Sequence, residues 1–277
     1  MADTVNGLLR EAAAQADPES RHEAEMLLAH ALGKDRAWLF AHANSVPDAH
    51  ALVRFRQLLA ARQGGEPLAY LLGRRGFWTL ELEVSPAVLI PRMETELLVE
   101  LALARVPRDS GMRIADLGTG SGAIALAVAS ERPLSRVLAT DASTAALELA
   151  RNNALRCGID NISFAHGHWL QALQGQRFGL IVSNPPYIAE GDAHLEQGDL
   201  RFEPVAALAS GVDGLDAIRE IVEGAPRCLD SGGWLLLEHG YDQASRVREL
   251  LAGNGFGEVC SWQDLERRER VSGGRYR

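Results

Sequence analysis

Cysteine is scarce in this sequence, which has only Cys157, Cys228 and Cys260 among its 277 residues. The number is odd and no two of the three form a CxxC pair, which argues against a disulfide framework and against a zinc site. Apolar runs are also short, and none approaches the ~20 residues that a membrane-spanning helix needs. The N-terminus lacks the basic stretch and long apolar stretch of a secretory signal. We therefore expect a cytoplasmic chain that binds no membrane and no metal.

Basic side chains are scarce in the greater part of the chain. Residues 1–75 carry nine acidic and nine basic side chains, whereas the remainder carries 28 acidic and 19 basic ones and accounts for the whole net charge of −9. Affinity for phosphate backbones comes largely from clustered Lys and Arg. The charge distribution therefore argues against direct binding of a nucleic-acid duplex.

The length of the chain suits one domain of about 200 residues and a smaller one. Apolar residues within residues 4–75 recur at three- and four-residue spacing, which predicts amphipathic helices packed as a small bundle. Residues 77–84 alternate between apolar and polar side chains, which predicts a half-exposed hairpin. We expect an N-terminal helical domain over residues 1–75, a hairpin linker over residues 76–90 and a second domain over residues 91–277.

From residue 114 onward, short apolar runs alternate with helical patterns until a final hairpin. This alternation predicts an α/β fold, a Rossmann-like, doubly wound, mostly parallel sheet with an antiparallel edge strand. Ligands of such sheets bind at the carboxyl ends of the strands. The predicted strands cover residues 114–117, 137–140, 162–165, 178–183, 233–239, 258–262 and 270–276. The predicted helices cover residues 123–129, 144–153, 215–229 and 243–251.

A glycine-rich loop follows the first of these strands. Its residues are Gly118, Thr119, Gly120, Ser121 and Gly122. A loop of this kind brings backbone N–H groups close to a ligand at the N-terminus of the next helix. The glycine spacing also fits a dinucleotide fingerprint, so the loop alone leaves the class of cofactor open.

Asp141 ends the next predicted strand, at the distance from the glycine loop where a ribose-binding acid is expected. We expect its carboxylate to meet the ribose hydroxyls of a cofactor, and N-capping of the helix that follows is the alternative, which could coexist with that role. Trp169 is expected to cover an adenine ring. His166 and His168 lie two apart on an extended segment, but no third ligand accompanies them, so the sequence favours no metal there.

Two prolines and a tyrosine end the apolar run of residues 178–182, in the order Ser183-Asn184-Pro185-Pro186-Tyr187. Successive prolines cannot continue a sheet ladder, so we expect the chain to leave the sheet at Asn184. The prolines fix φ and remove N–H donors, which leaves carbonyl acceptors beside the Asn184 amide. A planar NH2 group would fit there, bonded to the Asn184 side-chain oxygen and the Pro185 carbonyl under the Tyr187 ring. A strand that merely ends in a proline-rich turn is the alternative for the bare Asn-Pro-Pro.

Together these motifs resemble those of the Rossmann-like S-adenosylmethionine-dependent methyltransferases, and more narrowly those of the release-factor glutamine methyltransferases. The Asn-Pro-Pro-Tyr tetrapeptide is shared with amino-group methyltransferases of adenine and guanine. The segment that contains Glu203-Pro204 and the helical N-terminal segment are similar to those of the glutamine enzymes. The resemblance extends along the chain over Gly65–Tyr70, Leu89–Arg92, Glu94–Glu96, Asp116–Ala125, Arg201–Pro204 and Ala207–Leu208. The sequence departs from the family pattern at Met93, His168 and Glu266.

The resemblance implies methylation of the side-chain amide nitrogen of the glutamine in the Gly-Gly-Gln motif of class I peptide-chain release factors. It implies that the loop of residues 118–122 binds the amino-acid portion of S-adenosylmethionine, Asp141 the ribose and Trp169 the adenine region. Asn184 would contact cofactor and substrate, and the segment through Pro185, Pro186 and Tyr187 would hold the glutamine. Asn184, Pro185 and Tyr187 are thus the expected catalytic residues, and the N-terminal domain is expected to support docking of the substrate protein.

Three other functions remain open from the sequence. The first is a glutamine methyltransferase that acts on a ribosomal protein. The second is an adenine N6-methyltransferase, against which the acidic second domain argues. The third is a catalytically silent cofactor-binding or interaction module, against which the intact Asn-Pro-Pro-Tyr segment argues.

Overall fold

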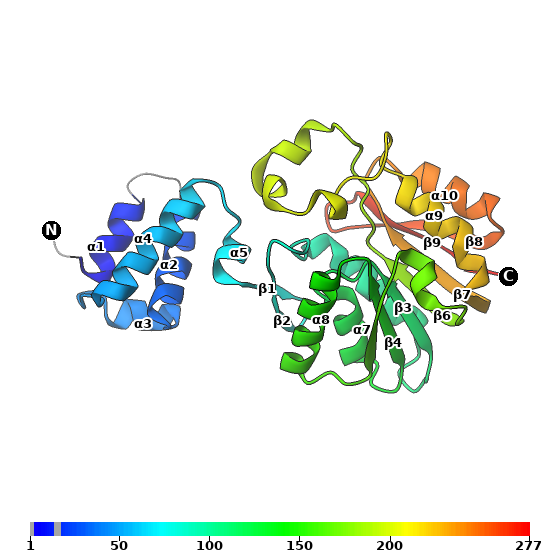
Figure 1. Ribbon diagram of the computed structural model, residues 1–277, viewed down its shortest axis with the longest axis horizontal. Helices are drawn as coiled ribbons and strands as arrows, with labels where there is room; N and C mark the ends of the chain where they lie inside the picture. Colours follow the sequence, from blue (N-terminus) through cyan, green and yellow to red (C-terminus); the bar gives the residue numbers. More distant parts are fainter. Residues whose placement is uncertain (1–2, 14–17) are drawn as a thin grey trace. The chain divides into compact units, whose positions relative to one another are not determined.

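The computed structural model describes residues 3–13 and 18–277, and the chain divides into two compact units, Met1–Gly73 and Arg74–Arg277. Figure 1 labels the helices and strands of both units. No helix in the described part of the chain is long and apolar enough to cross a membrane.

The first unit is helical, as the sequence predicted. Its helices are α1 (Val5–Ala13), α2 (Pro18–Leu32), α3 (Arg36–Ala41), α4 (Ala49–Gln63) and α5 (Leu68–Leu72). The helix α2 contacts each of the other four, and its Leu27 and Leu28 are fully buried beside Phe55. Asp35 and Asp48 cap α3 and α4, because the carboxylate of each accepts a backbone N–H of the first helical turn.

The second unit contains a two-stranded hairpin and a seven-stranded sheet. The hairpin consists of β1 (Arg74–Phe77) and β2 (Leu80–Glu83). The strands of the large sheet are β3 (Arg113–Leu117), β4 (Arg136–Asp141), β5 (Ile162–His166), β6 (Phe178–Ser183), β7 (Leu229–Glu238), β8 (Phe256–Gln263) and β9 (Glu269–Tyr276). The α-helices are α6 (Glu96–Arg105), α7 (Ala123–Glu131), α8 (Thr144–Cys157), α9 (Asp216–Gly224) and α10 (Ala244–Gly253).

The large sheet has the strand order β5-β4-β3-β6-β7-β9-β8 and is parallel except for β9. The doubly wound sheet and its final antiparallel hairpin are confirmed, with the detail that β9 lies between β7 and the outermost strand β8. Leu117 of β3 stands opposite Thr140 on one side and Ser183 on the other. The glycine loop, Asp141 and Asn184 therefore leave the sheet at the same edge.

Helices cover both faces of this sheet. One apolar cluster joins the sheet to α6, α7 and α8, and it includes Phe77 and Leu82 of the hairpin. The other joins the sheet to α9 and α10, which lie next to each other in Figure 1. The predicted hairpin is present, but it begins at Arg74, and its buried side chains make it part of the second unit.

The predicted helix over residues 215–229 was wrong at its C-terminal end. The α-helix α9 ends at Gly224, a 3₁₀ turn (Ala225–Arg227) follows, and Leu229 is the first residue of β7. The turn contains Pro226, which has no N–H to donate to the preceding helical turn, so the α-helical hydrogen bonding cannot continue. The strand β7 accordingly starts four residues before the predicted Gly233.

Candidate active site

The glycine loop has the conformation that only glycine adopts without strain. Gly118, Gly120 and Gly122 have φ values of 71°, 56° and 87°. Asp141 holds this loop: its Oδ2 accepts the N–H of Gly120 at 2.9 Å and its Oδ1 accepts the N–H of Ser143 at 2.8 Å. The carboxylate thus orders both the glycine loop and the start of α8, while each oxygen keeps a further lone pair.

A buried carboxylate lies beneath the same loop. Asp116 at the end of β3 is fully buried, and its Oδ2 accepts the hydroxyl of Thr119 at 2.6 Å. Among the described residues, its Oδ1 has no hydrogen-bond partner. Burial raises the pKa of Asp116 to about 7, against the effect of the Thr119 hydrogen bond. The sequence analysis assigned this residue no role beyond the family motif.

Trp169 lies against the glycine loop. A Cβ at Gly118 would stand 3.0 Å from an atom of the indole ring, so the absence of a side chain at Gly118 permits the close approach. Trp169 itself has φ 40° and begins the 3₁₀ turn η2 (Trp169–Leu173). His166 bonds to the carbonyl of Ala142, and His168, which lines the same cavity as Trp169, pairs with Glu220.

A cavity of about 480 Å³ opens at this edge of the sheet. This volume lies within the range of about 300–1,000 Å³ that is usual for small-molecule sites. The lining includes the predicted site residues Gly118–Ser121, Asp141, Trp169, Asn184 and Pro186. Gly122, Pro185 and Tyr187 do not line it. Gly122 instead caps α7, where a Cβ would stand 3.2 Å from the Cβ of Ala150.

Asn184 is connected to buried polar groups behind the cavity. Its Nδ2 donates to the hydroxyl of Thr95 at 3.2 Å. The hydroxyl of Tyr187 points to Glu238 at the end of β7 and donates to its Oε1 at 3.4 Å. The Tyr187 ring packs against the apolar cluster of α9 and α10, and burial raises the pKa of its hydroxyl. Burial also raises the pKa of Glu238 to about 7, although the nearby Thr95 hydroxyl and the positive charge of Arg270 oppose the shift.

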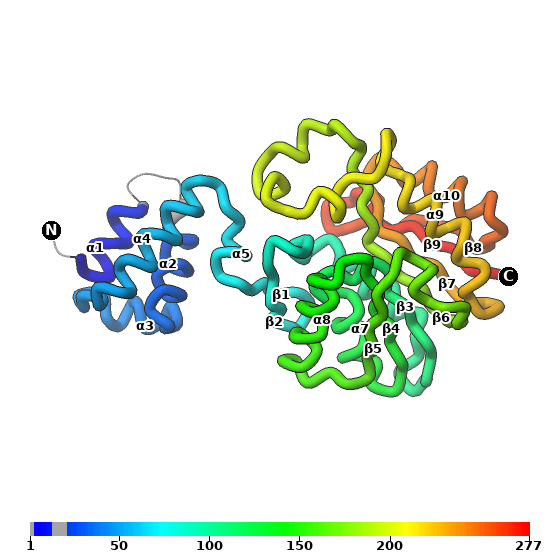
Figure 2. The backbone as a smooth tube through the Cα atoms, viewed as in Figure 1, coloured from blue at the N-terminus to red at the C-terminus, as the bar shows by residue number. Residues whose placement is uncertain are grey.

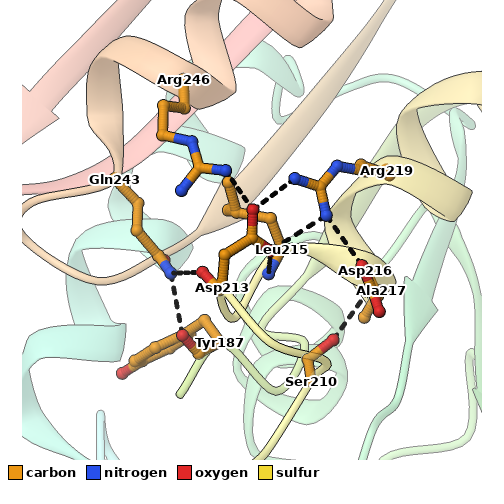
Figure 3. Close-up of polar contacts among 9 residues, drawn as sticks. All are labelled: Tyr187, Ser210, Asp213, Leu215, Asp216, Ala217, Arg219, Gln243 and Arg246. Atoms are coloured by element: carbon orange, nitrogen blue, oxygen red, sulfur yellow. Dashed lines mark hydrogen bonds and ion pairs between the residues drawn. The ribbon is translucent and has the colours of Figure 1, made fainter. Parts of the chain in front are cut away.

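The segment after Tyr187 is anchored by a second polar cluster, drawn in Figure 3. Gln243 donates from Nε2 to the carbonyl oxygens of Tyr187 at 2.9 Å and of Asp213 at 3.4 Å. The Asp213 carboxylate forms ion pairs with Arg219 and Arg246, and hydrogen bonding by Arg219 is the main reason that the pKa of Asp213 lies below its usual range. The same cluster therefore holds both the Tyr187 carbonyl and Asp213, which lies near the end of the loop of residues 184–215.

The long loop of residues 184–215, which Figure 2 traces from β6 to α9, forms one rim of the cavity. Its Glu203 is buried and pairs with Arg92, and it accepts the N–H of Ile90 at 3.2 Å. Pro204 and Arg92 both line the cavity. This ion pair fastens the loop to the segment before α6.

Thr95 and Glu238 were missed by the sequence analysis. Thr95 lies 89 residues from Asn184 in the chain, so no local pattern connects them. Glu238 has one signal, its position at the carboxyl end of the predicted strand directly after the apolar run Trp234–Leu237, but its burial was not expected because carboxylates are seldom fully buried.

Family models match both units of the chain. The model described as the PrmC N-terminal domain matches residues 8–73, and the model described as the methyltransferase small domain matches residues 93–200.

Curated relatives match nearly the whole chain. A release factor glutamine methyltransferase of Xylella fastidiosa is 57% identical over 263 residues, which cover 95% of this chain and 96% of that protein. The chain belongs to the release factor glutamine methyltransferase family. Family members of the same name from Pseudomonas aeruginosa and Escherichia coli are 50% and 47% identical, and the matches cover 99% and 97% of both proteins in each pair.

Solved structures of other methyltransferases share the fold of this member of the release factor glutamine methyltransferase family. The 16S rRNA N2 G1207 methyltransferase of Thermus thermophilus, solved with AdoMet and guanosine, has a TM-score of 0.55 at 20% identity, over 74% of this chain and 50% of that one. A ribosomal protein L11 methylase of Lactobacillus delbrueckii has a TM-score of 0.51 at 22% identity, over 70% and 84%. At these identities the likeness shows the fold alone.

Proposed function

We propose that this chain transfers a methyl group from S-adenosylmethionine to the side-chain amide nitrogen of the glutamine in the Gly-Gly-Gln motif of class I peptide-chain release factors. The observation that carries the proposal is that one cavity is lined by the glycine loop, Asp141, Trp169 and Asn184. The names of the relatives support the substrate. A cytoplasmic location fits such a substrate.

The cofactor side of the cavity fits a nucleoside with a charged amino-acid tail. The backbone of residues 118–122 would face the amino-acid portion, since the N–H groups of such a loop lie close to a ligand at the N-terminus of α7. Asp141 would accept the ribose hydroxyls, since its oxygens each use only one lone pair on backbone N–H groups. Trp169 would cover the adenine. S-adenosylmethionine, when bound, supplies a methyl group on a positively charged sulfur.

The substrate side is proposed to hold an amide NH2 group. Asn184 Oδ1 and the Pro185 carbonyl would accept its two hydrogens, with Pro186 and Tyr187 completing the segment that holds the glutamine. An amide nitrogen is a poor nucleophile because its lone pair is conjugated with the carbonyl. Acceptors placed for a pyramidal nitrogen would favour the geometry that the nitrogen reaches during transfer, and alignment alone can be worth ~7–11 kcal/mol in favourable cases. No general base is needed before transfer, and a proton leaves afterwards to water.

The proposal is tested by incubating the full chain with methyl-labelled S-adenosylmethionine and, separately, a release factor, ribosomal proteins and DNA. Label in the glutamine of the Gly-Gly-Gln motif is expected. Label in ribosomal protein or DNA alone, or no label at all, would contradict the proposal and would favour one of the three alternative functions.

Replacement of Asn184 tests its part in the reaction. We expect Asn184→Ala to lose at least about a factor of ten in the single-turnover rate, because a substrate N–H is then left without an acceptor at ~1–3 kcal/mol. Asn184→Asp keeps an oxygen at the same reach and should be the milder change. An Asn184→Ala variant as fast as the parent at saturating substrate would remove Asn184 from the mechanism.

A further inference from the structure

The side chain of Gln243 joins three segments of the chain at the base of the long loop. Its Nε2 donates to the carbonyl of Tyr187 at 2.9 Å and to that of Asp213 at 3.4 Å, and Figure 3 shows both bonds. Its Oε1 accepts the N–H of Gly240 at 2.8 Å. Gln243 stands directly before α10 and is 7% exposed, so water does not readily replace these partners. One amide thus ties both ends of the loop of residues 184–215 to the start of α10.

The three partners also fix which way this amide is turned. Each of them is a backbone group, and a backbone N–H only donates whereas a carbonyl only accepts. The N–H of Gly240 therefore requires the oxygen of Gln243, and the two carbonyls use both hydrogens of its NH2 group. The amide has no second orientation that satisfies all three bonds.

The segment Asn184–Tyr187 is stiff and is held at both of its ends. Its two prolines have fixed φ angles, so few torsions remain free between those ends. At the first end, Ser183 of β6 is fully buried, and its hydroxyl donates to the carbonyl of Leu117 at 2.7 Å. At the other end, the carbonyl of Tyr187 is held by Gln243. Release of one end of a stiff segment changes the direction in which the whole segment presents its acceptors.

We propose that Gln243 is a positioning residue for methyl transfer, which sets the placement of the segment Asn184–Tyr187 by holding the carbonyl of Tyr187. This inference rests on the proposed function and deepens it, because it names a residue outside the cavity on which the substrate side depends. Gln243 does not line the cavity, so it acts through Tyr187 and not on the reacting atoms.

Gln243→Met tests the inference directly. Methionine has nearly the length of glutamine but forms no strong hydrogen bond, so the Tyr187 carbonyl loses its donor. We expect kcat at saturating release factor to fall about tenfold, because the segment that holds the glutamine is no longer fixed. The affinity for S-adenosylmethionine, measured by calorimetry, should stay within about twofold, since other bonds hold the glycine loop and Asp141.

Asn161→Leu is the matched control for a general loss of stability. The Nδ2 of Asn161 also donates to backbone carbonyls, those of Ala129, Arg132 and Ser135, at 3.1, 3.0 and 3.2 Å. Asn161 stands directly before β5, at the end of the sheet away from the cavity. This variant should unfold at lower denaturant concentration than the parent and keep the parent kcat, whereas Gln243→Met should lose kcat.

Gln243→Glu adds a readout that a purely structural role would not give. A protonated carboxyl accepts from Gly240 and donates to the Tyr187 carbonyl, whereas an ionised one has no hydrogen to donate and repels that carbonyl. Burial favours the neutral form, so we expect the rate of the folded variant, divided by the parent rate, to fall as pH rises from about 6 to about 8.5. Nearby titratable and charged groups are the same in both proteins and cancel in this ratio: Glu238, Asp242, and Asp213 with Arg219 and Arg246.

The outcomes distinguish this inference from the function on which it rests. A parent chain that labels no glutamine overturns the proposed function. A parent that labels glutamine, with Gln243→Met as fast as the parent or slowed no more than Asn161→Leu, overturns the positioning role and leaves the function intact. A rate ratio of Gln243→Glu that does not change with pH also overturns it, and this measurement decides if Gln243→Met does not fold.

Discussion

Gly214 lies against the carbonyl of Tyr187, in the segment that is proposed to hold the substrate glutamine, and adding one methyl group there should slow the reaction. Its φ of +74° is unfavourable for other residues, and a Cβ at this position would stand 2.2 Å from the carbonyl oxygen of Tyr187. Real Cβ atoms essentially never come closer than 3.0 Å, so the two groups must separate by about 0.8 Å. Gln243 Nε2 bonds the carbonyls of both Tyr187 and Asp213 and would itself stand 2.7 Å from the new Cβ, so the added methyl group disturbs the bond that holds the Tyr187 carbonyl.

The size of the effect follows from this displacement. A misplacement of ~1 Å can cost about a hundredfold in rate, so we expect Gly214→Ala to lower the single-turnover rate by about tenfold to a hundredfold. Affinity for S-adenosylmethionine, measured by calorimetry, should change little because the glycine loop is untouched. The left-handed backbone itself should cost about 1–2 kcal/mol of folding free energy.

Gly175 supplies the control. It has the same φ of +74°, but nothing lies within 4 Å of the position of its Cβ. Gly175→Ala therefore carries the backbone strain without the contact and should keep the parent rate. Equal rates for the Gly214→Ala and Gly175→Ala variants, both folded, would refute the argument that the Tyr187 carbonyl must stay where it is.

Three further predictions concern the cofactor, the first unit and the buried carboxylate. Asp141→Ala should weaken binding of S-adenosylmethionine about tenfold or more, since bonds to a charged acceptor are worth about 1.5–3 kcal/mol; unchanged affinity by calorimetry would leave Asp141 only its bonds to the loop and α8. Deletion of residues 1–73 should weaken methylation of whole release factor more than that of a short Gly-Gly-Gln peptide, and equal losses would contradict a docking role. The pKa of Glu238 is raised from 4.5 to about 7 in the folded state, so the folded protein releases this proton at a higher pH than the unfolded chain does. The contribution of Glu238 to the free energy of unfolding therefore falls as pH rises from about 4.5 to about 7. Glu238→Gln should therefore make the free energy of unfolding fall less steeply over that range in denaturant titrations, and an unchanged slope would show that Glu238 does not titrate there.

The arrangement of the cavity was largely predictable from the sequence. Each predicted site residue follows a strand, and parallel strands bring their carboxyl ends to one edge, so the convergence of the glycine loop, Asp141 and Asn184 required only the correct sheet order. Trp169 was expected near a cofactor, and its contact with Gly118 places it at the same cavity.

The contacts behind the cavity were not predictable in the same way. The bond between Thr95 and Asn184 and the bond between Tyr187 and Glu238 join elements that are distant in sequence and adjacent only after folding. Tyr187 was expected to cover the substrate amide from the order of residues alone; the structure packs its partly buried ring against the apolar core and directs its hydroxyl to Glu238. Its stacking on a substrate remains a prediction.

The hairpin β1–β2 has a consequence for any attempt to shorten the protein. Asn153 of α8 is completely buried, and its amide exchanges hydrogen bonds with the backbone of Glu83 and also donates to the carbonyl of Ser121 in the glycine loop. A shortened chain that starts at residue 91 would remove two of the three hydrogen bonds of this amide, which then keeps only its bond to Ser121 of the glycine loop. A fragment that begins at Arg74 retains the hairpin and keeps the hydrogen bonds between Asn153 and Glu83.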